Sequence, residues 1–278
     1  MTSTGLVETA RAGDLDALGE RVSDVVGRSI RHDGYYLQGL DPSGIESFGV
    51  GSLGPGAHRL RIPLVSGRRR YGLLTLWRHD EEFETTPVPF GRTFAPVLRE
   101  YVTSAALARS ARPLPPGVLV VGRDRVTAMS AEARAWLAAI PHWTKWERGA
   151  LPRVAIRQLS KAARLALVDK RKPRAVTCVP AARCGQWVEI HGQVLADDLT
   201  LIIRPASGAR LVSSLSWWYG ITPRERQVLD LVCEGGSAKR IARVLELSTH
   251  TVNEYLQSIY RKTRSSGRDE LVALLLQG

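Results

Sequence analysis

Cysteine is scarce in this sequence, and long apolar runs are missing. The 278 residues include three cysteines, Cys178, Cys184 and Cys233, which form no CxxC pair. An odd number of widely spaced cysteines predicts neither a disulfide framework nor a zinc site, although Cys178 and Cys184 leave a redox pair open as an alternative. No run approaches the ~18 apolar residues of a membrane span, and the start, MTSTGLVETARAGD, lacks the order of a signal peptide. We therefore expect a cytoplasmic chain without metal, cofactor or membrane partner.

Positive charge is abundant, but it is concentrated in the middle of the chain. The formal net charge is +12, and residues 151–210 hold 11 basic and 4 acidic residues. The densest run, Lys170 to Arg174, has two interpretations. Pro173 favours a solvated loop, and the alternative is a patch that adds non-specific affinity for DNA phosphates.

The residues from Thr222 onward begin with a strong helix-start signal. Thr222, Pro223 and Glu225 match a capping box with proline at the first helical position. An apolar face follows at helical spacing, and Gly235-Gly236 supplies the residues that a helix end prefers. The sequence therefore predicts a helix between Thr222 and Gly235.

Two further helices follow at close spacing. Ser237 can cap a short helix, and Ser248 can cap a longer one after the brief turn Glu246-Leu247. Such a turn suits two helices that cross steeply, as in a helix-turn-helix. In the longer helix, Val252, Leu256 and Ile259 form a buried stripe. The polar residues that must then point outward are Asn253, Glu254, Gln257 and Arg261.

A fourth helix is expected after Ser266. Its residues Leu271, Val272, Leu274, Leu275 and Leu276 are too apolar for a lone surface helix. A dimer contact through Leu271, Leu274 and Leu275 would explain the excess.

This segment resembles the C-terminal DNA-binding domain of LuxR-type bacterial regulators. It shares TPRE, the Gly-Gly-Ser turn, KRIARVL and STHTV with that family, in the same order and over about one fifth of the chain. The resemblance implies a four-helix domain whose third helix enters the major groove and whose fourth helix often dimerises. The DNA contacts that it implies are base edges for Asn253, Glu254 and Gln257, with Arg261 beside them, and phosphates for Lys239, Thr249, Thr251 and Lys262.

Two positions depart from the family pattern. Asn253 stands where the family commonly has Lys, and Tyr255 stands where it often has His. Asn and Gln suit bidentate contact with adenine, and Glu254 can accept from cytosine. We therefore expect DNA binding with an altered sequence preference.

The first part of the chain, residues 1–112, resembles a GAF sensor domain. A helical pattern, strands at 35–37, 59–64 and 71–77, the phrase IPLVSGRRRYGLLTLW and a closing amphipathic helix occur in that order. The middle of the pattern is shorter than is usual in the family. A working sensor and a domain used only for dimerisation are therefore both open.

Residues 113–208 resemble a PAS domain. The connector PLPPG opens this part, a strand is expected at 118–121, and Ser130 can cap a helix. A helical stretch and strand candidates at 175–180, 186–194 and 199–204 follow. Four tryptophans, Trp136, Trp143, Trp146 and Trp187, are expected in the core, with a cavity for a flat ligand as the alternative.

The expected fold is α+β and multidomain: a GAF-like domain (1–112), a PAS-like domain (113–208), a linker helix (209–220) and an all-α helix-turn-helix domain (221–278). Both upstream domains are expected to contain antiparallel sheets. The resemblance implies a homodimeric transcription regulator that binds pseudo-palindromic DNA, and an unknown small-molecule ligand is a further expected partner.

Two other functions would share parts of this pattern. A sigma-factor-like promoter reader would share the helix-turn-helix, but its polymerase-binding region is not recognisable. An enzyme with a DNA-binding tail would need chemistry that is missing: there is no Gly-x-Ser-x-Gly, no phosphate loop and no metal-spaced histidine pair. No catalytic residue is predicted.

Overall fold

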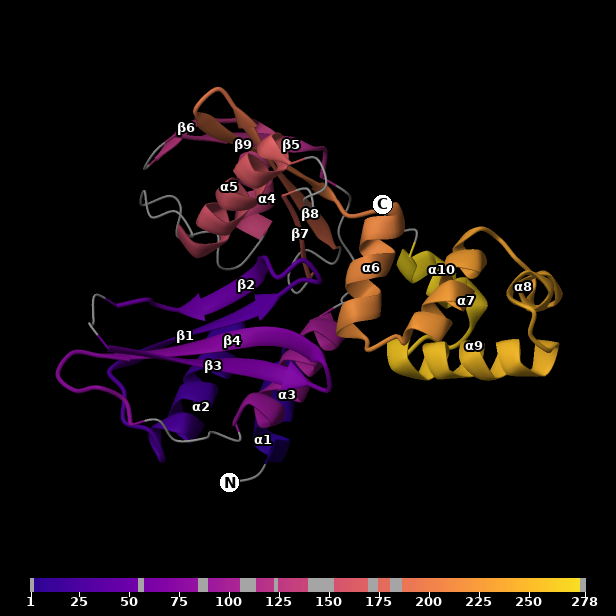
Figure 1. Cartoon of the computed structure of the whole chain (residues 1–278), viewed down its shortest axis with the longest axis horizontal. Coiled ribbons are helices and arrows are strands. Elements are labelled where there is room, and N and C mark those ends of the chain that lie inside the picture. The colour runs from indigo at the N-terminus through magenta and orange to yellow at the C-terminus, as the bar shows by residue number, and fades with distance from the viewer. Residues whose placement is uncertain are drawn as a thin grey trace. The chain divides into compact units, whose positions relative to one another are not determined.

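The computed structural model describes residues 3–54, 58–84, 90–105, 114–122, 125–139, 153–169, 175–180 and 187–275. The chain divides into two compact units, Met1–Arg204 and Pro205–Gly278. The first unit holds two antiparallel sheets and the second consists of helices, which confirms the fold class expected from the sequence (Figure 1). The expected limit between residues 112 and 113 stays a prediction, because residues 106–113 lie outside the described part.

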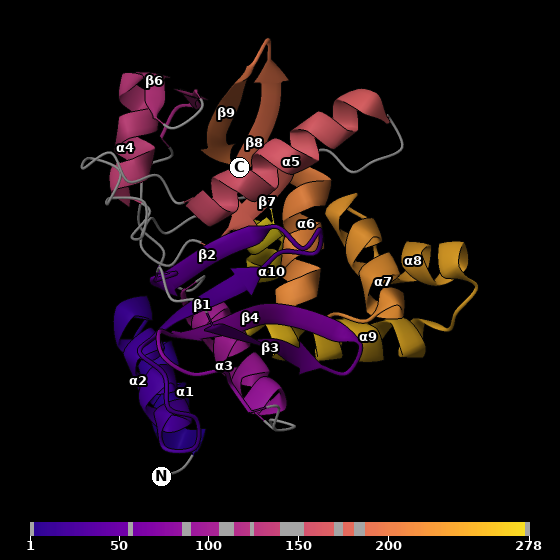
Figure 2. The same cartoon turned by 60° about the vertical axis from the view of Figure 1, so that its left-hand side comes forward.

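The first sheet has the strand order β2-β1-β4-β3, and each neighbouring pair is antiparallel. Helices α2 and α3 pack against it, and α1 packs against α2 and α3 (Figure 1 and Figure 2). The elements are α1 (Ser3–Arg11), α2 (Leu15–Gly27), β1 (Gly34–Leu40), β2 (Glu46–Gly51), β3 (His58–Ser66), β4 (Arg69–Arg78) and α3 (Phe90–Ala105).

The alternation along β3 separates the core from the solvent. Ile62 and Leu64 are buried, whereas Arg61 and Pro63 between them are exposed. Successive side chains of a strand point to opposite faces, so this pattern turns one face of the sheet toward the helices. The expected strands 59–64 and 71–77 correspond to β3 and β4.

The second sheet has the order β6-β5-β9-β8-β7. Helices α4 and α5 contact β5 and β8, respectively. Ser130 caps α4 as expected, because its Oγ accepts from the backbone N–H of Ala133 at 3.2 Å. The elements are β5 (Gly117–Val121), β6 (Val126–Met129), α4 (Ala131–Ala139), α5 (Arg153–Val168), β7 (Val176–Val179), β8 (Val188–Leu195) and β9 (Asp198–Pro205).

Three elements were not expected from the sequence: α1, β2 and β6. Strand β2 contains Gly49 and Gly51, and Gly51 has a φ of +89°. Glycine weakens a strand pattern, so the sequence gives no strand signal where the structure has a paired strand. Strand β6 has no buried residue, and periodicity therefore gives no signal for it.

The second unit is built from α6 (Gly208–Trp218), α7 (Pro223–Cys233), α8 (Ala238–Leu245), α9 (Thr249–Thr263) and α10 (Arg268–Leu275). Helix α6, expected as a linker over 209–220, packs within this unit against α7 and α10. Arg226 of α7 donates to Oγ of Ser216 at 3.3 Å and to the carbonyl of Ala209 at 3.5 Å. The linker helix is therefore fastened along its length to the helices that follow it.

A substitution at Gly117 tests how closely α4 packs against the second sheet. A Cβ at this position would lie 2.3 Å from the backbone N of Ala133, at the start of α4. Because backbone cannot move aside cheaply, we expect Gly117→Ala to lower the free energy of unfolding by about 2 kcal/mol, measured by denaturant titration. Gly192→Ala is the matched control in the same sheet, since its Cβ would meet neighbours only at 3.4 Å. Equal stability of the two variants would contradict the close approach.

Candidate DNA-binding surface

The start of α7 forms the capping box that the sequence predicts. Oγ1 of Thr222 accepts from the backbone N–H of Glu225 at 3.3 Å, and the N–H of Thr222 donates to Oε2 of Glu225 at 2.6 Å. Pro223 occupies the first turn, where its missing N–H costs nothing. These contacts fix the point at which α7 begins.

Glu225 also connects α7 to the far end of α9. Nζ of Lys262 donates to Oε1 and Oε2 of Glu225 at 2.8 and 2.6 Å and to the carbonyl of Gly220 at 3.2 Å. Oγ of Ser258 donates to Oε1 at 2.7 Å. All three N–H groups of the ammonium therefore have acceptors inside the protein.

This environment favours the ionised form of Glu225. Burial by itself would raise the pKa of Glu225, but the hydrogen bonds from Lys262, Thr222 and Ser258 outweigh it and lower the pKa from 4.5 to about 2. Only 5% of the Glu225 side chain and 26% of the Lys262 side chain are exposed. The pair is therefore a largely desolvated contact.

The turn between α8 and α9 places the longer helix on the surface. Oγ of Ser237 caps α8, and Oγ of Ser248 caps α9 by accepting from the N–H of Thr251 at 3.0 Å. Glu246 adopts a left-handed conformation with φ of +55°, which lets the chain turn sharply between the helices. The expected caps and turn are thus present.

The outward face of α9 has the predicted composition. Val252, Leu256 and Ile259 are buried. The side chains of Asn253, Glu254, Gln257 and Arg261 are exposed. His250 lies 3.6 Å from Glu254, and both are exposed, so this pair adds little to the stability of α9. Helical periodicity alone was sufficient to find the polar row.

The residues expected at phosphates divide into two groups. Lys239 and Thr249 are exposed on the first turns of α8 and α9. Thr251 is half-buried, and its Oγ1 lies 2.9 Å from Oγ of Ser248. Lys262, by contrast, is held by Glu225 and Gly220. Its ammonium would have to leave these partners before it could contact a phosphate.

Two exposed arginines on α8 were not singled out from the sequence. Arg240 and Arg243 lie on the same helix as Lys239, whereas Ile241 and Ala242 on this helix are buried. Helical periodicity in the segment AKRIARVL could have identified them, because it places the basic residues on the polar face. They extend the cationic surface beside α9.

The leucines expected at a dimer contact lie inside the protomer. Leu271, Leu274 and Leu275 are 0%, 6% and 2% exposed, and α10 contacts α6, α7 and α9. The apolar excess of this helix is therefore explained by packing within one chain. These three side chains do not form an exposed face in the structure, and Leu276 lies outside the described residues.

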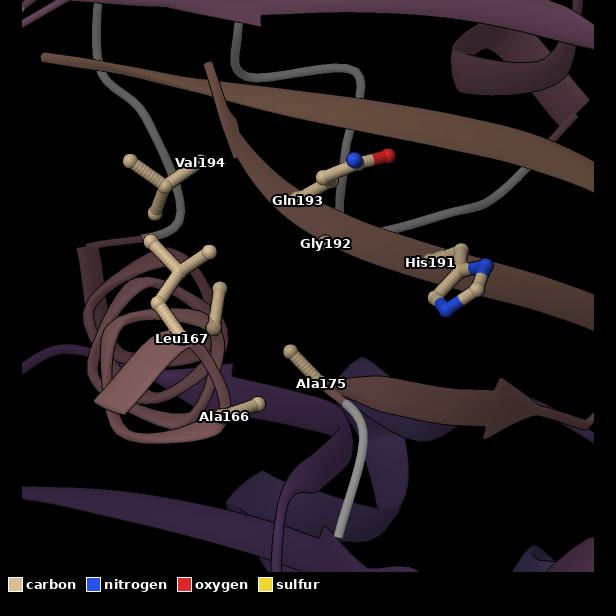
Figure 3. A pocket seen from close by; sticks show the side chains of 8 residues that line it. Ala166, Leu167, Ala175, His191, Gly192, Gln193 and Val194 are labelled. Atoms are coloured by element: carbon tan, nitrogen blue, oxygen red, sulfur yellow. The ribbon is translucent and has the colours of Figure 1, made fainter. Parts of the chain in front are cut away.

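A shallow cavity in the first unit is the second candidate site. It measures about 310 Å³ and lies between α5 and β8. Figure 3 shows Ala166 and Leu167 of the helix beside the strand that carries His191 to Val194. The small side chains Ala163, Ala166, Ala175 and Gly192 leave this space open.

The tryptophans and cysteines support packing roles where they are described. Trp136 and Trp187 are buried, and Nε1 of Trp136 donates to the carbonyl of Pro115 at 2.8 Å. Cys178 is buried and Cys233 is half-buried, and burial raises the pKa of the Cys233 thiol. Several expected features lie outside the described residues: Trp143, Trp146, Cys184 and the run Lys170 to Arg174.

Neither a metal centre nor a membrane span is found in the part of the chain that the structure describes. None of its helices is both long and apolar enough to cross a bilayer. Among the same residues, no group of three or more His, Cys, Asp or Glu side chains could hold a metal ion.

Comparison with known proteins agrees with the C-terminal geometry. The family model described as "Bacterial regulatory proteins, luxR family" matches residues 220–275. A response regulator of Synechocystis is 45% identical over 56 residues, which are 20% of this chain and 24% of that protein. The monoamine regulon transcriptional regulator of Klebsiella aerogenes is 43% identical over 53 residues, 19% of this chain and 23% of that protein. The chain thus spans about a quarter of the length of these relatives.

Among solved structures, the chain resembles a phage VqmA in complex with DPO. The match has 15% identity and a TM-score of 0.28, and it covers 58% of this chain and 80% of that one. A likeness at this level carries no conclusion about ligand or assembly.

The contribution of the ion pair between Glu225 and Lys262 to stability can be tested by substitution. Glu225→Gln removes the charge and leaves the ammonium of Lys262 without its counter-ion, so we expect the free energy of unfolding at pH 7 to fall by about 3 kcal/mol, measured by thermal denaturation. The folded pKa of Glu225 is about 2, below the ordinary 4.5. The stability that its charge contributes is therefore complete above pH 4.5 and is lost as the pH falls toward 2.

The variant and the wild type should consequently converge in acid. Glu234→Gln, at an exposed glutamate that ends the same helix, is the control and should cost little. A constant difference between Glu225→Gln and wild type from pH 7 to pH 2 would show that the ion pair is not its source.

Proposed function

We propose that this chain, whose C-terminal domain is a LuxR-type helix-turn-helix domain, is a regulator of transcription that binds double-stranded DNA through α9. The observation that carries the proposal is the exposed row Asn253, Glu254 and Gln257 on a helix capped and turned outward by Ser248. A recognition helix of this kind inserts its outward face into the major groove. Such a regulator acts where the chromosome lies, in the cytoplasm.

The chemistry of the row indicates what it would read. Asn253 and Gln257 have amides that can donate and accept at once, which matches the N6 and N7 groups of adenine. Glu254 accepts only, and it fits the N4 amino group of cytosine. Because Asn253 replaces the Lys that is common in the family, the recognised sequence would differ from the usual one.

Binding strength would come from the cations around this row. Lys239, Arg240 and Arg243 on α8 and Arg261 on α9 are exposed and can approach backbone phosphates. Lys262 would act differently, because it ties α9 to Glu225 and Gly220. Its contribution to binding would be indirect, through the orientation of the helix.

A homodimer on a pseudo-palindromic site is the assembly that we propose, with the two copies of α9 about 34 Å apart. If α10 forms the contact, its outer side would do so. Ala273 is exposed there and Val272 is half-buried, whereas the neighbouring leucines are buried.

The first unit would supply the signal. The cavity between α5 and β8 is lined mainly by apolar side chains, with His191 and Gln193 as its polar groups. A small, largely apolar molecule with one or two hydrogen-bonding groups is the ligand class that fits such a lining. The GAF-like and PAS-like assignments of this unit stay predictions, and so does its use in dimerisation.

Base reading is tested by selecting bound sequences from a random DNA library with the full chain. We expect Gln257→Ala and Asn253→Ala to lose about 1–3 kcal/mol of discrimination at particular base pairs, because a missing amide cannot distinguish adenine from other bases. Ser213→Ala, at an exposed position on α6, is the control and should leave the selected sequence unchanged. Selection of no sequence by the wild type would remove the proposal.

Phosphate contacts are tested by the salt dependence of affinity. Arg243→Ala should weaken binding to all sequences alike and should reduce the slope of log K against log salt by about 1, since one released counterion is lost. Lys262→Met should leave that slope unchanged, because the ammonium is engaged within the protein. A lower slope for Lys262→Met would instead return Lys262 to the phosphate contacts.

A further inference from the structure

The two sheets of the first unit meet where β2 contacts α5 and β7. Glu46, the first residue of β2, makes both cross-connections with its backbone. Its N–H donates to Oε1 of Gln158 on α5 at 2.6 Å, and its carbonyl accepts from Oγ1 of Thr177 on β7 at 3.2 Å. We call this contact between β2, α5 and β7 the seam. One residue therefore links the first sheet to two elements of the second.

The side chain of Glu46 is buried, and only one of its two carboxyl oxygens has a hydrogen-bond partner in the described part of the chain. Its Oε1 accepts from the hydroxyl of Tyr36 at 2.7 Å. Its Oε2 is buried and has no hydrogen-bond partner in the described part of the chain. An ionised carboxylate with one orphan oxygen pays a large desolvation cost, whereas the neutral acid pays much less. The site thus favours the protonated form.

Gly49 is the residue that admits the pair of Tyr36 and Glu46. A Cβ at position 49 would lie 2.3 Å from the Tyr36 hydroxyl oxygen and 2.9 Å from Oε1 of Glu46. Only glycine leaves room for both groups above the strand.

The charged and titratable groups on the elements packed around Glu46 do not neutralise it. Among the described residues, Glu46 takes part in no ion pair. The groups concerned are Asp16, Glu20, Arg21 and Asp24 on α2, Tyr35 and Tyr36 on β1, Asp41 and Asp33 at its two ends, Arg157, Lys161 and Arg164 on α5, and Cys178 on β7. Arg157 and Lys161 are exposed. Asp41 is buried, it is hydrogen-bonded by Ser43, Ile45 and Thr177, and burial raises the pKa of its carboxyl above the ordinary value.

We propose that Glu46 is a proton-operated latch across the seam: the neutral acid keeps the two sheets together, and loss of its proton loosens β2 from α5 and β7. The device responds to pH in the neutral range, and it does not depend on the proposed function. All the groups that take part belong to this unit.

The direction of the pH response follows from the raised pKa of Glu46. Burial raises the pKa of Glu46 to about 7, although the hydrogen bond from Tyr36 opposes this rise. The folded unit therefore keeps a proton that the opened unit, with its ordinary pKa of 4.5, has released. Stability of the seam is complete below pH 4.5, and it decreases as the pH rises through about 7.

Hydrogen exchange on the full chain tests the latch. We expect the protection factors of β7 and α5, corrected for the intrinsic pH dependence of exchange, to fall about tenfold between pH 6 and pH 8. Helix α9, in the other unit, serves as the internal reference and should not change in this way. A flat protection profile at the seam of the wild type would overturn the proposal.

Three variants separate Glu46 from its neighbours. Glu46→Gln keeps the shape without the proton equilibrium and should abolish the pH dependence, whereas Glu20→Gln, at an exposed glutamate on α2, should retain it. Tyr36→Phe removes the hydrogen bond that favours the ionised form, so the midpoint should move to higher pH. This last variant keeps the test intact if Glu46→Gln does not fold.

Carboxyl carbon NMR provides the direct measurement. A Glu46 resonance that titrates near pH 7 in the wild type and is absent in Glu46→Gln supports the latch. A resonance that titrates near 4.5, or an unchanged exchange profile in Glu46→Gln, contradicts it.

Discussion

One ion pair holds α9, the helix that we propose to read DNA, against the start of α7. Glu225 is part of the cap that starts α7, and the same carboxylate receives Lys262 and Ser258 from the far half of α9. A single buried group therefore fixes where one helix begins and how another lies against it. Lys262 also reaches the carbonyl of Gly220, so the end of α6 is held by the same contact. Rigid support of this kind is what the proposed function requires, because the polar row of α9 would then present a defined pattern of hydrogen-bonding groups.

Much of this architecture could be predicted from the sequence. Capping residues such as Thr222 and Ser248 are local signals, and the stripe of Val252, Leu256 and Ile259 determines which side of α9 faces outward. Lys262 shows the limit of such reasoning. Periodicity gives the direction of a Cα–Cβ bond, but a long side chain at the edge of the buried stripe can fold back toward a carboxylate that is distant in sequence. The partner, 37 residues away, is a tertiary fact.

The same limit explains α10 and β2. Leucines at 271, 274 and 275 show that a helix is covered, but not whether the cover is its own chain or a second copy. Strand β2 was hidden because its glycines weaken the pattern, yet those glycines serve packing: Gly49 makes room for the Tyr36 and Glu46 side chains. Gly49, which has a low propensity for strands, is thus required in β2 for steric reasons.

Helix α6 has a practical consequence for engineered fusions. Because Arg226 contacts Ser216 and Ala209 along this helix, and Lys262 contacts Gly220 just after it, α9 and α6 belong to one compact unit. A fusion protein that carries this helical unit should therefore be joined at Pro205, ahead of Gly208, and not at Thr222. A junction at Thr222 would transfer α7 to α10 without α6, the helix that packs against α7 and α10.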